Sequence, residues 1–188
     1  MNEISLAGLL AICALALSAC FASEEPLIDK AASATPLKPG NYVAIDKKPG
    51  DKDPPTRLKV TTEGNATIFT NVEPGDDDEP TKVLMRKVRG NYYAMLESKE
   101  GEKSYIYMLA EIDGAGMKMY DFTDACKTLE GIAADKRADI TSYGVARVEK
   151  GAELDTCYFK RFEDLATAFK AVMDARPLKL VTEVTPAA

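Results

Sequence analysis

The stretch that decides the fold is SYIYMLAEIDGAGMKMYDF, residues 104–122. Apolar and aromatic side chains occupy both sets of alternating positions up to Asp113, and a glycine-containing turn over 114–116 then leads into a second apolar run. Two such runs joined by a short turn predict a β-hairpin. Because both faces of the first run are apolar or amphipathic, we expect its strand to be central in a sheet and covered on both sides.

The two faces of this strand carry different chemistry. One face is aliphatic with one methionine, and the other presents Tyr105, Tyr107 and Leu109. The tyrosine face either packs as core or lines a cavity or a partner surface, since tyrosine combines contact area with a hydroxyl. The candidate ligand or partner residues are therefore Tyr92, Tyr105, Tyr107 and Tyr120, with Tyr42 added for a cavity.

On the N-terminal side of the hairpin, β-prone runs recur at hairpin spacing. Together with the hairpin they make seven candidate strands, which predict an antiparallel meander. These strands are expected at 41–45, 57–62, 66–72, 82–89, 91–97, 104–113 and 117–122.

The C-terminal part adds helices. Apolar residues from Phe162 to Met173 recur at three- and four-residue intervals and predict an amphipathic helix over 162–176, which Pro177 ends. The predicted fold class is α+β, mainly β, with the meander forming a small barrel or curved sheet that this helix covers. In strand count and order of elements it resembles the calycin-type barrels. The remaining expected elements are a helix over 124–131, strands over 142–148 and 154–160, and an edge strand or tail over 178–184.

Composition restricts the chemistry. The 188 residues carry a net charge of −6 and contain no histidine. An acidic chain is a poor partner for a nucleic-acid backbone, and the absence of histidine removes the commonest general base and metal ligand. The sequence also lacks the serine-hydrolase, phosphate-loop and dinucleotide-binding motifs. We therefore expect a protein without catalytic activity, cofactor or metal, and we keep a hydrolase based on paired carboxylates as an alternative.

The N-terminus has the pattern of an export signal. Residues 6–17 are almost all apolar, a run too short to span a bilayer but typical of a signal-peptide core. Leu17-Ser18-Ala19-Cys20 follows and resembles the lipobox of bacterial lipoproteins. The resemblance implies cleavage before Cys20 and a diacylglyceryl group on its sulfur. The first residues depart from the family pattern, since they contain Glu3 and no Lys or Arg, and a buried helix in a cytosolic protein is the alternative.

The lipobox divides the chain into three parts. The expected parts are a signal peptide over 1–19, a lipidated Cys20 with a flexible tether over 20–39, and a single β-rich domain over 40–188. Phe21 stands where an Asp would favour inner-membrane retention, so the chain resembles the lipoproteins sorted to the outer membrane.

Two cysteines remain once the signal peptide and the lipid are assigned. In an exported chain, Cys126 and Cys157 are expected to form one disulfide, and a redox-active or metal-binding pair is the alternative. Met117 and Met119 place two thioethers on one strand face, a pattern that soft metals such as Cu(I) accept but that ordinary core packing also explains.

The sequence thus predicts a location more sharply than an activity. We expect an outer-membrane lipoprotein whose periplasmic domain is a non-catalytic binding or envelope-structural module. Its partners would be membrane lipid through Cys20 and a protein or cell-wall component. A carrier of small apolar ligands, with a cavity inside the barrel, is the main alternative.

Overall fold

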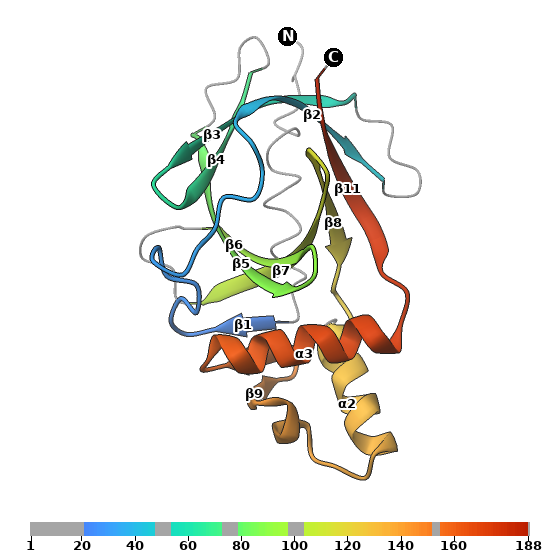
Figure 1. Ribbon diagram of the computed structural model, residues 1–188. Helices are drawn as coiled ribbons and strands as arrows, with labels where there is room; N and C mark the ends of the chain where they lie inside the picture. Colours follow the sequence, from blue (N-terminus) through green and yellow to red (C-terminus); the bar gives the residue numbers. More distant parts are fainter. Residues whose placement is uncertain (1–20, 48–53, 73–78, 98–103, 152–154, 188) are drawn as a thin grey trace, which may run out of the picture.

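The structure, a computed structural model, describes residues 21–47, 54–72, 79–97, 104–151 and 155–187. Eight antiparallel strands close into a barrel, and a layer made of two helices and three further strands packs beside it (Figure 1). The predicted fold class is confirmed. The barrel strands are β2 (Gly40–Asp46), β3 (Thr56–Glu63), β4 (Ala66–Asn71), β5 (Thr81–Arg89), β6 (Tyr92–Glu97), β7 (Tyr105–Asp113), β8 (Gly116–Asp121) and β11 (Lys179–Pro186).

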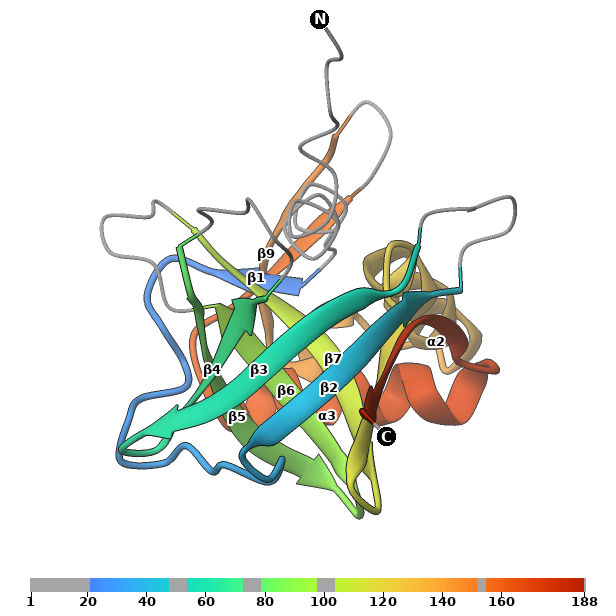
Figure 2. The same ribbon diagram turned by 90° about the horizontal axis from the view of Figure 1, so that it is seen from above.

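The hairpin predicted over 104–122 is present as β7 and β8. Asp113 pairs with Gly116 across a turn in which Gly114 has a φ of 62°, a backbone conformation that favours glycine. The strand order runs β6-β5-β4-β3-β2-β11-β8-β7, and the additional pairing of β6 with β7 closes the barrel. Figure 2 shows the strands crossing around the barrel from above.

The last strand departs from expectation. The stretch 178–184 was expected to be an edge strand or a tail, but β11 pairs with β2 on one side and with β8 on the other. It therefore closes the gap between the first and last strands of the meander. Closure leaves neither β2 nor β8 with an open edge on this side of the sheet.

The predicted tether is also corrected. Phe21–Ser23 form a strand, β1, that pairs with β7 and runs parallel to β10 (Thr156–Phe159). The rest of 24–39 lies against the barrel, with Ile28 and Leu37 buried and Ala34 bridged to Met85. Sequence reasoning missed this because isolated apolar residues between prolines show no periodicity. Cys20 and the predicted signal peptide lie outside the described residues.

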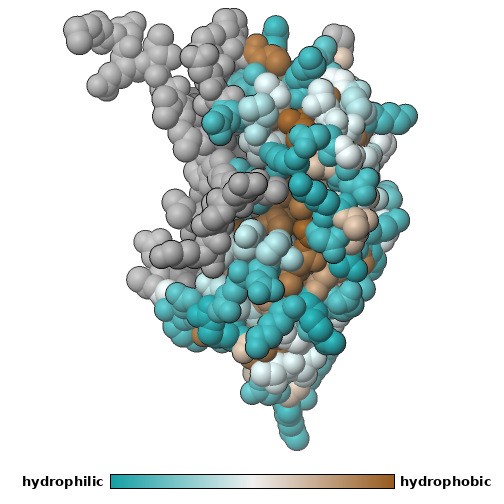
Figure 3. Space-filling view, turned by 90° about the vertical axis from the view of Figure 1, so that its left-hand side faces the viewer, coloured by the Kyte–Doolittle hydropathy of each residue, from teal (hydrophilic) through white to brown (hydrophobic). Residues whose placement is uncertain are grey.

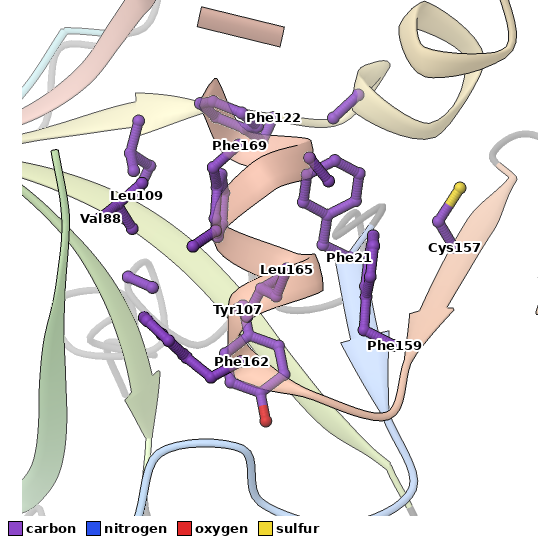
Figure 4. Close-up of a cluster of buried hydrophobic side chains, with 14 of the residues drawn as sticks. Phe21, Val88, Tyr107, Leu109, Phe122, Cys157, Phe159, Phe162, Leu165 and Phe169 are labelled. Carbon is purple, nitrogen blue, oxygen red and sulfur yellow. The ribbon is translucent and has the colours of Figure 1, made fainter. Parts of the chain in front are cut away.

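The buried side chains form two separate cores. One fills the barrel, and the other lies between the outer face of the barrel and helix α3 (Phe162–Ala175). In this outer core Phe21 contacts three other rings, and the labelled aromatic side chains converge on α3 (Figure 4). Strand β7 belongs to both cores, as its two apolar faces predicted: Leu109 lies in the outer core and Ala110 in the inner one.

A disulfide links two elements in the C-terminal part of the chain. The sulfurs of Cys126, in helix α2 (Ala125–Asp135), and Cys157, in β10, are bonded at 2.04 Å, which confirms the predicted pairing. The strand expected over 142–148 is shorter, since a 3-10 helix, η2 (Ile140–Tyr143), precedes β9 (Val145–Glu149). Among the described residues, no helix is long and apolar enough to cross a membrane.

Candidate functional site

A pocket lies inside the barrel, near the end where β3 and β5 begin and β4 and β6 end. Its walls come from seven strands and are almost wholly apolar. Most of these side chains occupy alternate positions of their strands, because only every second residue of a strand points inward. The lining residues are Leu58, Phe69, Thr81, Val83, Met95, Glu97, Met108, Met117, Met119 and Val184.

Methionines form a continuous belt in this interior. Met85 on β5 is the cross-strand partner of Met95 on β6, and Met95 is the partner of Met108 on β7. Met119 on β8 pairs with Ala110, which makes it the diagonal neighbour of Met108. Met117 lies two residues from Met119 on the same face. Five of the seven methionines of the chain therefore face the lumen.

Little space remains in this pocket of the lumen. Tyr42, the one tyrosine suggested for a cavity that lies in this core, is buried and donates its hydroxyl to the carbonyl of Lys38 at 2.8 Å. Leu37 is buried among the lumen side chains, in the segment that leads into β2. The void that remains in the pocket is about 10 Å³. This is close to the space that one water molecule needs, so no organic ligand fits without movement of the walls.

Few polar groups accompany the apolar lining. Thr81 and Glu97 contribute the polar part of the pocket wall. Elsewhere in β4, the fully buried hydroxyl of Thr67 has no hydrogen-bond partner among the described residues.

Figure 3 shows one face of the molecule, where hydrophobic side chains lie in a hollow surrounded by hydrophilic ones.

The four candidate tyrosines lie along one outer face of β6, β7 and β8, but they differ in exposure. Tyr107 is 1% exposed, and its hydroxyl contacts the Ser23 hydroxyl at 2.8 Å and accepts the Leu27 amide at 2.7 Å. Burial raises the pKa of Tyr107. Tyr107 is thus a core residue and not part of a ligand surface. Tyr105 is half-buried beside Ser23, its cross-strand partner in β1.

Tyr92 and Tyr120 form a pair opposite Glu111 and Leu109, about 13 to 20 Å along the outer face of β7 from Tyr105. Their ring centroids are 6.1 Å apart, and the Tyr120 hydroxyl donates a hydrogen bond to Glu111. Burial, the hydrogen bond to Glu111 and the charge of Glu111 together raise the pKa of Tyr120 above its ordinary value. Both tyrosines are half-buried, so the edges of the pair remain open to a partner.

The sequence analysis identified only part of the methionine belt. Met117 and Met119 stood out because they are two residues apart, whereas Met95 and Met108 are brought to them by strand register. No signal in one sequence gives that register. Among the described residues, no group of three or more His, Cys, Asp or Glu is placed to hold a metal ion.

Comparison with protein-family models, with curated proteins and with solved structures finds no match to this chain. The geometry of the described residues therefore has to support any functional conclusion.

Proposed function

We propose that this protein is a lipoprotein of the outer membrane, anchored through Cys20, whose periplasmic domain is a non-catalytic binding module. The observation that carries the binding role is the small void, about 10 Å³, of the lumen pocket that the described residues line. A carrier of apolar molecules needs a pocket of several hundred Å³. The packed barrel instead supports recognition of a larger partner, a protein or a cell-wall component, by the outer surface.

The position of β1 supports an anchored domain that lies close to the bilayer. Phe21 is completely buried and directly follows Cys20 in the chain. A lipid on Cys20 would therefore hold the folded body with no intervening linker. One acyl chain binds a membrane only marginally, whereas the two or three chains carried by such a cysteine give durable attachment.

Labelling with radioactive palmitate in the native host tests the anchor. The parent chain is expected to take up label and to begin at residue 20 by mass spectrometry, whereas Cys20→Ala is expected to stay unlabelled and uncleaved. Cys13→Ala is the matched control, because that cysteine would leave with the signal peptide and label should persist. Uptake of label by Cys20→Ala would contradict the proposal.

Chemical cross-linking in intact cells tests the binding surface at Tyr105. If its half-buried ring belongs to a partner surface, Tyr105→Ala lowers the yield of the cross-linked envelope complex and leaves the melting temperature nearly unchanged. A lower melting temperature with an unchanged yield of the complex would assign Tyr105 to packing alone and remove it from the binding surface.

A further inference from the structure

We propose that the lumen pocket binds a soft monovalent cation, Cu(I) or its analogue Ag(I), through the thioether sulfurs of Met95, Met108, Met117 and Met119. The inference rests on the proposed binding role and gives that module a second, small ligand inside the barrel. It is carried by the composition, the size and the surroundings of the pocket.

Four methionines line one pocket. Met95 and Met108 are direct cross-strand partners, whose Cβ atoms lie about 5 Å apart in such pairs. Met119 is diagonal to Met108, and Met117 follows on the same face of β8. Methionine has three rotatable bonds, so sulfurs from adjacent positions can turn toward a common point. The barrel thus gathers from three strands a set of soft donors that no single stretch of the sequence contains.

The size of the void favours an ion over an organic ligand. About 10 Å³ is open in the pocket, which is of the order of one water molecule. Water itself is a poor occupant, since it needs two to four polar partners and only Thr81 and Glu97 among the lining residues carry polar side chains. A cation that prefers sulfur to oxygen does not need those partners.

The donor set also selects the kind of metal. Thioethers are soft ligands that favour Cu(I), while zinc takes thiolate, imidazole or carboxylate, and calcium takes six to eight oxygens. The chain has no histidine, and Cys126 and Cys157 are joined to each other. The carboxylate of Glu97 in the wall and the net charge of −6 favour a cation over an anion.

Titration with Ag(I) tests the site, and it avoids the reductant that Cu(I) would require and that would open the disulfide. The protein is the full chain in detergent with Cys13→Ser and Cys20→Ser, so that no free thiol competes, and it carries no polyhistidine tag. Calorimetry is expected to show one Ag(I) bound per chain. Methionine methyl resonances in NMR spectra are expected to shift for the four lining residues and to stay in place for Met85 and Met173.

Substitution of methionine by leucine removes the sulfur and nearly conserves the side-chain volume. Such substitutions usually lower the free energy of unfolding by less than about 1.5 kcal/mol. Each of Met95→Leu, Met108→Leu, Met117→Leu and Met119→Leu is expected to weaken Ag(I) binding about tenfold or more, as loss of a ligand should cost no less than loss of its supporting groups. Met85→Leu, in the same belt but outside the pocket lining, is the matched control and should bind as the parent does.

Three results would overturn the inference: no binding at one equivalent of Ag(I), equal binding by the four variants and the control, or equal binding of Zn²⁺. Displacement of an apolar naphthylamine dye by fatty acid, with no response to Ag(I), would assign the pocket to an apolar ligand instead. None of these results bears on palmitate labelling of Cys20, so failure of the metal site and failure of the anchor are distinguishable.

Discussion

The backbone amide of Leu27 donates a 2.7 Å hydrogen bond to the hydroxyl of Tyr107, eighty residues further along the chain. The same hydroxyl contacts the side chain of Ser23, which is itself buried. One tyrosine of the barrel therefore fixes the segment that follows the proposed lipid anchor.

Tyr107→Phe should destabilise the protein by about 1–3 kcal/mol, because the buried Ser23 hydroxyl and Leu27 amide both lose a partner. Urea unfolding measures this loss, and hydrogen exchange at the Leu27 amide should accelerate. Tyr105→Phe, on the same face of β7, is the control that leaves the Leu27 bond intact. Equal effects of the two changes would show that the hydroxyl of Tyr107 does not hold the segment.

The segment 21–39 should contribute to the stability of the folded domain and should not act only as a connection to the proposed anchor. Phe21→Ala is expected to cost about 3–5 kcal/mol, because it removes a fully buried ring that packs against Phe122, Phe159 and Phe169. Thermal unfolding monitored by circular dichroism measures the change. Glu25→Ala, at an exposed position of the same segment, should lie within about 0.5 kcal/mol of the parent. A flexible tether would instead make both substitutions silent.

The disulfide should stabilise the layer outside the barrel. Cys126 and Cys157 are 31 positions apart, and closing such a loop is worth about 3–4 kcal/mol in the chain-entropy model. Replacing both residues with Ala, or adding reductant, should lower the melting temperature by about 10 °C. Unchanged melting on reduction would mean that packing of α2 and β10 suffices without the bond.

Thr67→Val should stabilise the protein. Its hydroxyl is completely buried and has no hydrogen-bond partner within the part of the chain that the structure describes, and such a group costs about 1–3 kcal/mol. Valine keeps nearly the same shape, so denaturant unfolding should show a gain of about 1 kcal/mol. Thr62→Val, at the exposed cross-strand partner, should change stability by no more than about 0.5 kcal/mol. A loss of stability in Thr67→Val would point to a buried water on the hydroxyl.

Stability should fall at alkaline pH. Burial, the hydrogen bond to Glu111 and its charge raise the pKa of Tyr120, and burial raises the pKa of Tyr42, Tyr92 and Tyr107. The unfolded chain releases these protons near pH 10, while the folded chain retains them. The stabilisation is therefore complete below about pH 10 and is lost as the pH rises toward the folded pKa values.

Urea unfolding at a series of pH values measures this dependence. Tyr120→Phe should show a shallower decline above about pH 10, because one raised pKa has been removed. If the profile of Tyr120→Phe superimposes on that of the parent, the Tyr120–Glu111 contact does not carry the effect.

Local pattern was enough for much of the fold. Alternation over 104–113, the turn at Gly114 and the helical spacing from Phe162 onward depend on neighbours a few residues away, so the hairpin and α3 could be predicted. The pairing of Cys126 with Cys157 also followed, because the predicted export signal left only these two cysteines for a disulfide. The candidate tyrosines could be placed on one strand face but not ranked by exposure, since Tyr107 is 1% exposed whereas Tyr120 is half-buried.

By itself the sequence determined the β-rich class, the terminal helix and the disulfide, because periodicity, turn residues and cysteine count are properties of short segments or of the whole composition. Only the tertiary structure decided that β11 closes the barrel, that Phe21 belongs to the core, and that Met95 and Met108 line one pocket with Met117 and Met119. These three facts depend on strand register and on contacts between distant segments. Both are set when the barrel closes, and no local pattern encodes them.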